Sequence, residues 1–98
     1  MMKKVLNRQA IIRMLQLHKE QTGKFGVRKI GLFGSFAKGK QKSKSDLDFL
    51  VVFDEPNFDK YMELKFFLEK LFHRKVDLVI EENLKSALKH VKREAIYV

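Results

Sequence analysis

The chain has 98 residues, of which 45% are hydrophobic and 11% aromatic, and its formal net charge is +9 at pH 7. This length allows one domain with a modest core, so we expect a single domain over residues 1–98. The absence of cysteine excludes disulfides and thiolate metal sites, and no apolar run reaches the about 18 residues of a membrane-spanning helix. Arg8 and Arg13 interrupt any apolar signal core near the start, so we expect a cytoplasmic protein. Its basic surface suits a nucleotide, RNA or an acidic partner protein.

The first predicted element is an amphipathic helix over residues 7–22, with Asn7 as its N-cap and Gly23 as its stop. The apolar run over residues 27–33 predicts a strand that ends at Gly34. The chain should therefore leave its first strand through a turn built from small residues.

A short helical turn is expected next, over residues 35–37, followed by a polar, lysine-rich loop over residues 38–44. Residues 46–53 predict a central strand, because their second half is continuously apolar, as in strands covered on both faces. Residues 54–57 contain the only proline and predict a turn.

The second half of the chain predicts a long helix over residues 58–73 and a strand over 76–80. A last helix is expected over residues 84–93, and residues 96–98 are expected to be extended. Helices that alternate with strands are typical of an α/β (or α+β) fold, with helices packed on one sheet.

One motif stands out: Gly34-Ser35 is followed, after ten residues, by Asp46-Leu47-Asp48. Small residues after a strand let backbone N–H groups approach a phosphate closely. On a strand, Asp46 and Asp48 would share a face, roughly 6–7 Å apart. Two such carboxylates can hold Mg²⁺, and paired metals serve phosphoryl or nucleotidyl transfer. Alone, the two carboxylates could also be an ordinary pair on an exposed strand, and Ser35 could be a helix N-cap.

These residues resemble the signature of the minimal nucleotidyltransferases, within the DNA polymerase β-like nucleotidyltransferase superfamily. The family places a third carboxylate on a later strand, and Val76-Asp77-Leu78-Val79 matches that setting. The resemblance covers nearly the whole chain and implies a small mixed β-sheet flanked by helices. Read without it, Asp77 could be a surface residue paired with Arg74 or Lys75.

The resemblance also implies a mechanism in which AMP moves from ATP to a hydroxyl acceptor with the help of two Mg²⁺ ions. Asp46, Asp48 and Asp77 would be the catalytic and metal-holding residues. Gly34, Ser35 and Lys38 would bind the nucleotide. Many family members carry arginine where this chain has Lys38, and lysine cannot reproduce the two-pronged hydrogen bonding of arginine to phosphate.

A domain of this size has little room for a pocket of its own for the acceptor. The resemblance implies a partner protein of the helical HEPN type, with this chain as the antitoxin that modifies a tyrosine of the toxin. One alternative is a catalytically weak or inactive module that binds nucleotide and neutralises its partner by contact. Another is an RNA-directed nucleotidyltransferase, which the positive charge favours.

A competing motif is present in the same segment, because Gly34 to Lys40 fits the phosphate-binding pattern Gly-x-x-x-x-Gly-Lys. Phe53-Asp54 imitates the acidic strand that accompanies it. However, Gln41 stands where Ser or Thr should bind Mg²⁺, and 98 residues are too few for the usual nucleotide-hydrolase sheet. We therefore favour the Gly-Ser and Asp-x-Asp interpretation.

Overall fold

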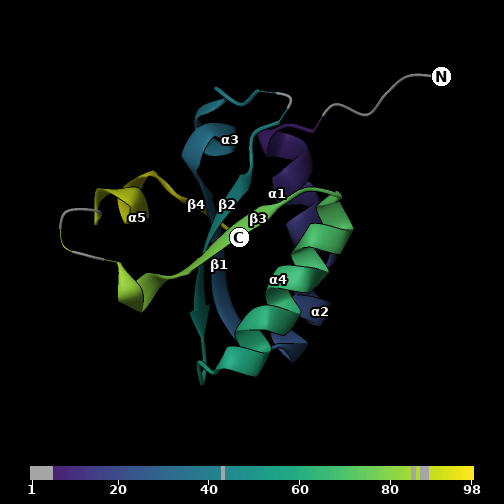
Figure 1. The fold of residues 1–98 in the computed structure, drawn as a ribbon, viewed down its shortest axis with the longest axis vertical. Coiled ribbons are helices and arrows are strands. Elements are labelled where there is room, and N and C mark those ends of the chain that lie inside the picture. The colour runs from purple at the N-terminus through teal and green to yellow at the C-terminus, as the bar shows by residue number, and fades with distance from the viewer. Residues whose placement is uncertain (1–5, 43, 85, 87–88) are drawn as a thin grey trace.

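The computed structural model describes residues 6–42, 44–84, 86 and 89–98. Its centre is one sheet with the strand order β3-β2-β1-β4 (Figure 1). The strands are β1 (Val27–Phe33), β2 (Leu47–Phe53), β3 (Val76–Ile80) and β4 (Ile96–Tyr97). β1 pairs antiparallel with β2 and β4, whereas β2 and β3 are parallel. The sheet is therefore mixed, as expected.

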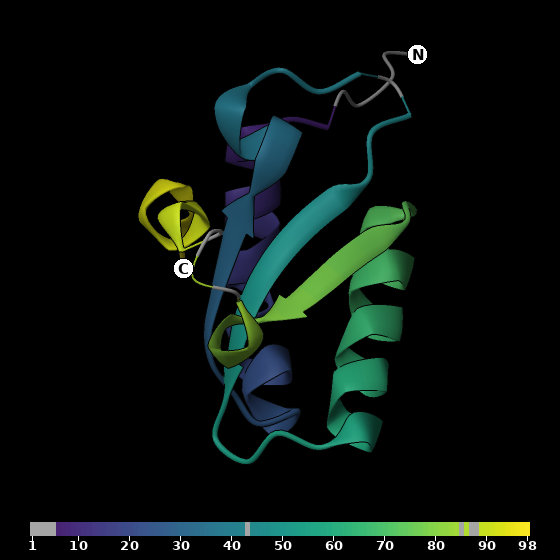
Figure 2. The same cartoon turned by 60° about the vertical axis from the view of Figure 1, so that its left-hand side comes forward.

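The helices are α1 (Arg8–Leu17), α2 (Lys19–Lys24), α3 (Gly34–Lys38), α4 (Phe58–Phe72) and α5 (His90–Glu94), with a 3-10 turn η1 (Glu81–Asn83). Figure 2 shows α1, α2 and α4 on one side of the sheet and α5 with η1 on the other. α4 makes the crossover between the parallel strands β2 and β3, which such a connection requires. None of the helices in the described ranges is long and apolar enough to cross a membrane.

The hydrophobic core lies between the sheet and the helices on its first side. Alternate residues of β2 point into this core, and all are buried: Leu47, Phe49, Val51 and Phe53. α1 contributes Ile11 and Leu15 to the core, and α4 contributes Leu64 and Leu68. Leu50 points to the opposite face of the sheet and is also fully buried. Cover on both faces explains why the end of β2 is continuously apolar.

The first predicted helix differs from the structure, because it is two helices that meet at His18. Asn7 is the N-cap as expected, since its side chain accepts a hydrogen bond from the Ala10 N–H at 2.9 Å. Gly23 is not the stop. It lies inside α2, and the chain turns instead at Gly26, which has a φ of 82°.

The other differences lie at element ends. β2 begins at Leu47, so Asp46 precedes the strand rather than opening it. The helix predicted over 84–93 is wrong as one element: in the described residues the α-helix covers only His90–Glu94, and residues 85, 87 and 88 lie outside the described part. The predicted strand over 76–80 and the extended Ile96–Tyr97 are confirmed.

We expect replacement of Leu68 by alanine to lower the free energy of unfolding by about 2–5 kcal/mol, because its fully buried side chain would leave a cavity in the core. The measurement is urea denaturation. Phe66→Ala is the matched control on the same helix, because Phe66 is 59% exposed and its loss should cost less than about 1 kcal/mol. Equal losses in the two variants would contradict this assignment of the core.

Candidate functional site

The candidate site lies at the end of the sheet where β2 and β3 begin. In the parallel register of these strands Asp48 is the direct partner of Asp77. Asp48 is partly buried, whereas Asp77 is exposed. Asp48 is two residues before Leu50, which points away from the main core, and Asp77 is the register partner of Asp48. Both carboxylates therefore lie on the face of the sheet opposite the main core. The structure thus brings together two carboxylates that are far apart in the sequence.

Asp46 lies beside this pair on the loop that enters β2. The expectation that the strand includes Asp46 is wrong, because the strand begins only at Leu47. Asp46 is still close enough for its charge to act on Asp48. The loop position leaves its carboxylate less fixed by sheet geometry than the other two.

The electrostatics of the site centre on Asp48. Partial burial, then repulsion from Asp77 and from Asp46, and a hydrogen bond shared with Asp77, raise the pKa of Asp48 from 3.8 to about 6. Each of these causes acts against the ionised carboxylate. At neutral pH the site therefore concentrates negative charge, and a cation would relieve the repulsion.

Gly34 forms the wall of the site on the side of β1. Its φ is 77°, a conformation that favours glycine. A Cβ atom at this position would overlap Oδ2 of Asp48 and lie 2.9 Å from its Cγ. The carboxylate of Asp48 therefore needs a glycine here, which is a structural reason in addition to the phosphate approach expected from the sequence.

Ser35 and Lys38 lie on α3, the short helix that follows Gly34. Gly39 ends this helix with a φ of 70°, and Arg8 Nη1 donates to the carbonyl of Ala37 at 2.8 Å. Lys38 Nζ lies 3.5 Å from Oε2 of Glu94 on α5, and both side chains are about half exposed. Since an exposed pair of this kind contributes little, Lys38 can exchange this partner for a ligand.

Arg74 is a residue of the site that the sequence analysis considered only as an ion-pair partner of a carboxylate. Its Nη1 donates to the carbonyl of Ser45 at 3.0 Å, and its guanidinium lies 5.3 Å from the centre of the Phe36 ring. Ser45 directly precedes Asp46. Phe36 directly follows Ser35. Arg74 therefore connects the loop that carries one carboxylate with α3, and no local sequence pattern signals this long-range role.

The donors of the site are carboxylate oxygens, which hard divalent cations such as Mg²⁺ prefer. The described residues contain no group of three acidic, histidine or cysteine side chains already arranged around a metal position. Asp48 and Asp77 are register partners on β2 and β3, with Asp46 on the adjoining loop. The chemistry of the donors fits a divalent cation.

Comparisons with known proteins agree with this geometry. A family model described as nucleotidyltransferase domain matches residues 13–98. Protein adenylyltransferase MntA of Thermococcus cleftensis is 44% identical over 97 residues, which span 96% of this chain and 98% of that protein. A solved structure provisionally described as a minimal nucleotidyltransferase has a TM-score of 0.81 at 31% identity, and covers 96% of this chain and 98% of that one. The predicted fold class is thereby confirmed.

A second solved structure adds a functional setting. It is a toxin–antitoxin crystal structure with AMP-PNP, and its TM-score is 0.61 at 28% identity. The match covers 88% of this chain and 66% of that chain.

We expect Asp48→Asn to stabilise the protein in metal-free buffer at pH 8. Because the pKa of Asp48 is raised in the folded protein, ionised Asp48 disfavours the fold above pH about 6. The neutral amide removes this cost. The gain in the free energy of unfolding should shrink as the pH falls through about 6 and vanish below 3.8, where the aspartate is protonated in both states. Urea denaturation over this pH range measures it.

Asp54→Asn is the control for this measurement, because Asp54 lies just after the other end of β2 and forms an exposed ion pair with Arg28. It should change stability by less than about 1 kcal/mol. A loss of stability in Asp48→Asn at pH 8, or a gain that does not depend on pH, would contradict the assignment of Asp48.

We expect Arg74→Met to disturb the loop before β2, because methionine keeps part of the contact with Phe36 but removes the donor to Ser45. The cost should be about 1–2 kcal/mol of unfolding free energy. Amide NMR signals of Ser45 and Asp46 should shift, while those of β4 stay in place. Arg28→Met is the control, since Arg28 pairs only with an exposed carboxylate among the contacts described for it. Unchanged loop signals would show that Arg74 does not hold this loop.

Proposed function

The chain belongs to the nucleotidyltransferase domain family, and on that premise we propose that it transfers AMP from ATP to a hydroxyl group of a partner protein. The observation that carries the proposal is the pairing of Asp48 with Asp77. Gly34 lies beside this pair, and any larger residue at position 34 would clash with the carboxylate of Asp48. The relative from Thermococcus cleftensis, named a protein adenylyltransferase, supports AMP as the group and protein as the acceptor.

In this proposal Asp46, Asp48 and Asp77 hold Mg²⁺. When bound, the ion supplies neutralising charge and Lewis acidity toward phosphate and hydroxyl oxygens. The raised pKa of Asp48 supports this role, because a bound cation would relieve the repulsion between Asp48 and the two neighbouring carboxylates. Without a bound cation, the same repulsion would favour partial protonation of these carboxylates near neutral pH.

The protein's own residues then perform binding, positioning and proton transfer. The backbone after Gly34 and the hydroxyl of Ser35 hold the β- and γ-phosphates, and Lys38 adds positive charge next to them. Asp77 is exposed and accepts the proton of the acceptor hydroxyl. The acceptor oxygen forms a bond to the α-phosphorus, the bond to the bridging oxygen breaks, and pyrophosphate leaves.

The proposed acceptor is a tyrosine of a helical toxin of the HEPN type, with this chain as the antitoxin. The support is the likeness to a toxin–antitoxin structure with AMP-PNP, at 28% identity. In this role, modification of the toxin would inactivate it. A domain with an open site and an exposed proton acceptor suits an acceptor that is itself a protein.

The test is label transfer from ATP labelled at the α-phosphate, with Mg²⁺, to the toxin partner that co-purifies with the chain. We expect the wild type to label the partner. Asp48→Asn should reduce the rate by more than about a hundredfold, because it removes a metal-holding carboxylate. A chelator should abolish labelling, and ribonuclease should leave the labelled band intact while protease removes it.

Asp54→Asn is the matched control, because it makes the same chemical change at the far end of the same strand. It should label the partner at the wild-type rate. If Asp48→Asn labels as fast as the wild type, the carboxylates are not catalytic. If no label moves although the partner is bound and neutralised, the chain acts by contact.

A further inference from the structure

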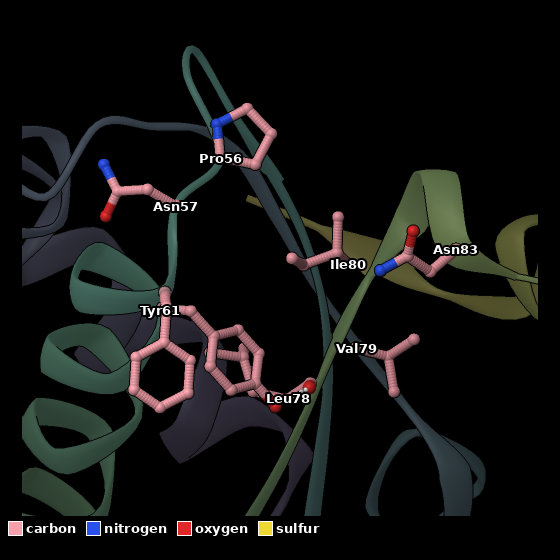
Figure 3. Close-up of a pocket in the computed structure, with 8 residues that line it drawn as sticks. Pro56, Asn57, Tyr61, Leu78, Val79, Ile80 and Asn83 are labelled. Carbon is pink, nitrogen blue, oxygen red and sulfur yellow. Dashed lines mark hydrogen bonds between the residues drawn. The ribbon is translucent and has the colours of Figure 1, made fainter.

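A groove of about 480 Å³ lies at the outer edge of the sheet, along the second half of β3. β3 forms its floor, and the start of α4 and η1 form its sides. Figure 3 shows Pro56 and Asn57 on one side of Ile80, and Asn83 with Val79 on the other. Since β3 is the last strand of the sheet on this side, the groove is open along its length.

The groove begins close to the proposed proton acceptor. Val79 lines the groove and shares a face of β3 with Asp77, at a distance along the strand of roughly 6–7 Å. The Tyr61 hydroxyl donates to the carbonyl of Leu78 at 2.5 Å and so joins α4 to β3 at the groove. Phe58, one helical turn before Tyr61 on α4, also lines the groove and is 74% exposed, which is unusual for a large aromatic side chain.

Three exposed carboxylates directly adjoin lining residues in the sequence: Glu55, Asp59 and Glu82. None of them takes part in an ion pair within the described residues. The chain nevertheless carries a net charge of +9. An acidic rim on a basic protein favours a basic ligand and repels a nucleotide.

The opposite side of the carboxylates is basic. Across the sheet the order is Gly34, Asp48, Asp77 and then the groove, because β2 lies between β1 and β3. Beyond Gly34, Lys38 ends α3 and Lys40 and Lys42 follow it, and all three are exposed. Phosphates are therefore drawn to one side of the site and excluded from the other.

We propose that this groove binds the acceptor substrate, as an extended, basic polypeptide segment whose tyrosine reaches Asp77 while an apolar side chain packs on Phe58. An extended segment fits because the groove follows a strand, and edge strands are common docking sites for such segments. This inference rests on the proposed transfer to a protein hydroxyl. It adds where the acceptor lies and what chemistry it carries.

The first arm of the test measures binding alone, by NMR titration of the wild type with the synthetic peptide KKYVK and its acidic counterpart EEYVE. We expect KKYVK to shift amide signals of Leu78, Ile80 and Asn83, and EEYVE to leave them in place. Phe58→Ala and Glu82→Lys should each weaken KKYVK about tenfold. Phe66→Ala, an exposed aromatic on the same helix, and Glu20→Lys, an equal charge change on α2, are the matched controls. Shifts elsewhere, or none at millimolar peptide, would overturn the proposal.

The second arm measures label transfer to KKYVK, so that the groove and the proposed function can fail separately. Phe58→Ala and Glu82→Lys should raise the KM for peptide about tenfold and leave the KM for ATP unchanged. If the peptide binds in the groove but no acceptor is ever labelled, the proposed function fails and the groove stands as a peptide site. If labelling proceeds with an unchanged peptide KM in both variants, the groove assignment fails and the proposed function stands.

Discussion

The parallel register of β2 with β3 is the constraint on which the site depends. It places Asp48 directly beside Asp77, although their charges repel. The hydrophobic core enforces this register, because a shift of β3 by one residue would turn its buried side chains toward the opposite face. Val76 and Leu78 are both buried and would be lost from the core. Packing in the core therefore keeps Asp48 and Asp77 side by side despite their repulsion.

The second constraint is steric. Gly34 lies against the carboxylate of Asp48, so the start of α3, β2 and β3 each contribute one position to a continuous line across this end of the sheet. This line separates a basic side, which begins at α3, from an acidic and apolar side at the edge of β3. A reaction that joins an anion to a neutral hydroxyl benefits from such a division, because each substrate is favoured on a different side.

The sequence predicted the strands well because their apolar runs are continuous and bounded by glycine, proline or charged residues. It predicted Asp48 and Asp77 as site residues through the motif and the resemblance. Helix ends were less predictable. The first helix breaks at His18, whose ring Nδ1 contacts the Met14 carbonyl at 2.8 Å, and no periodicity reports this contact. Arg74 was missed for a related reason: its partners lie on segments that only the folded chain brings near.

The crossover formed by α4 also determines when the site can exist. β1 and β2 are neighbours in sequence, so their pairing needs only a short loop to close, whereas β3 joins after a whole helix has packed. A chain that has formed only the first two strands has Gly34, Asp46 and Asp48 but lacks Asp77 beside them. β3 is also an edge strand that brings like charges together, so it has a partner strand on one side only and electrostatic repulsion at its start. Partly folded or partly opened chains of this protein should therefore have no assembled site, and the chemistry is confined to the fully folded molecule.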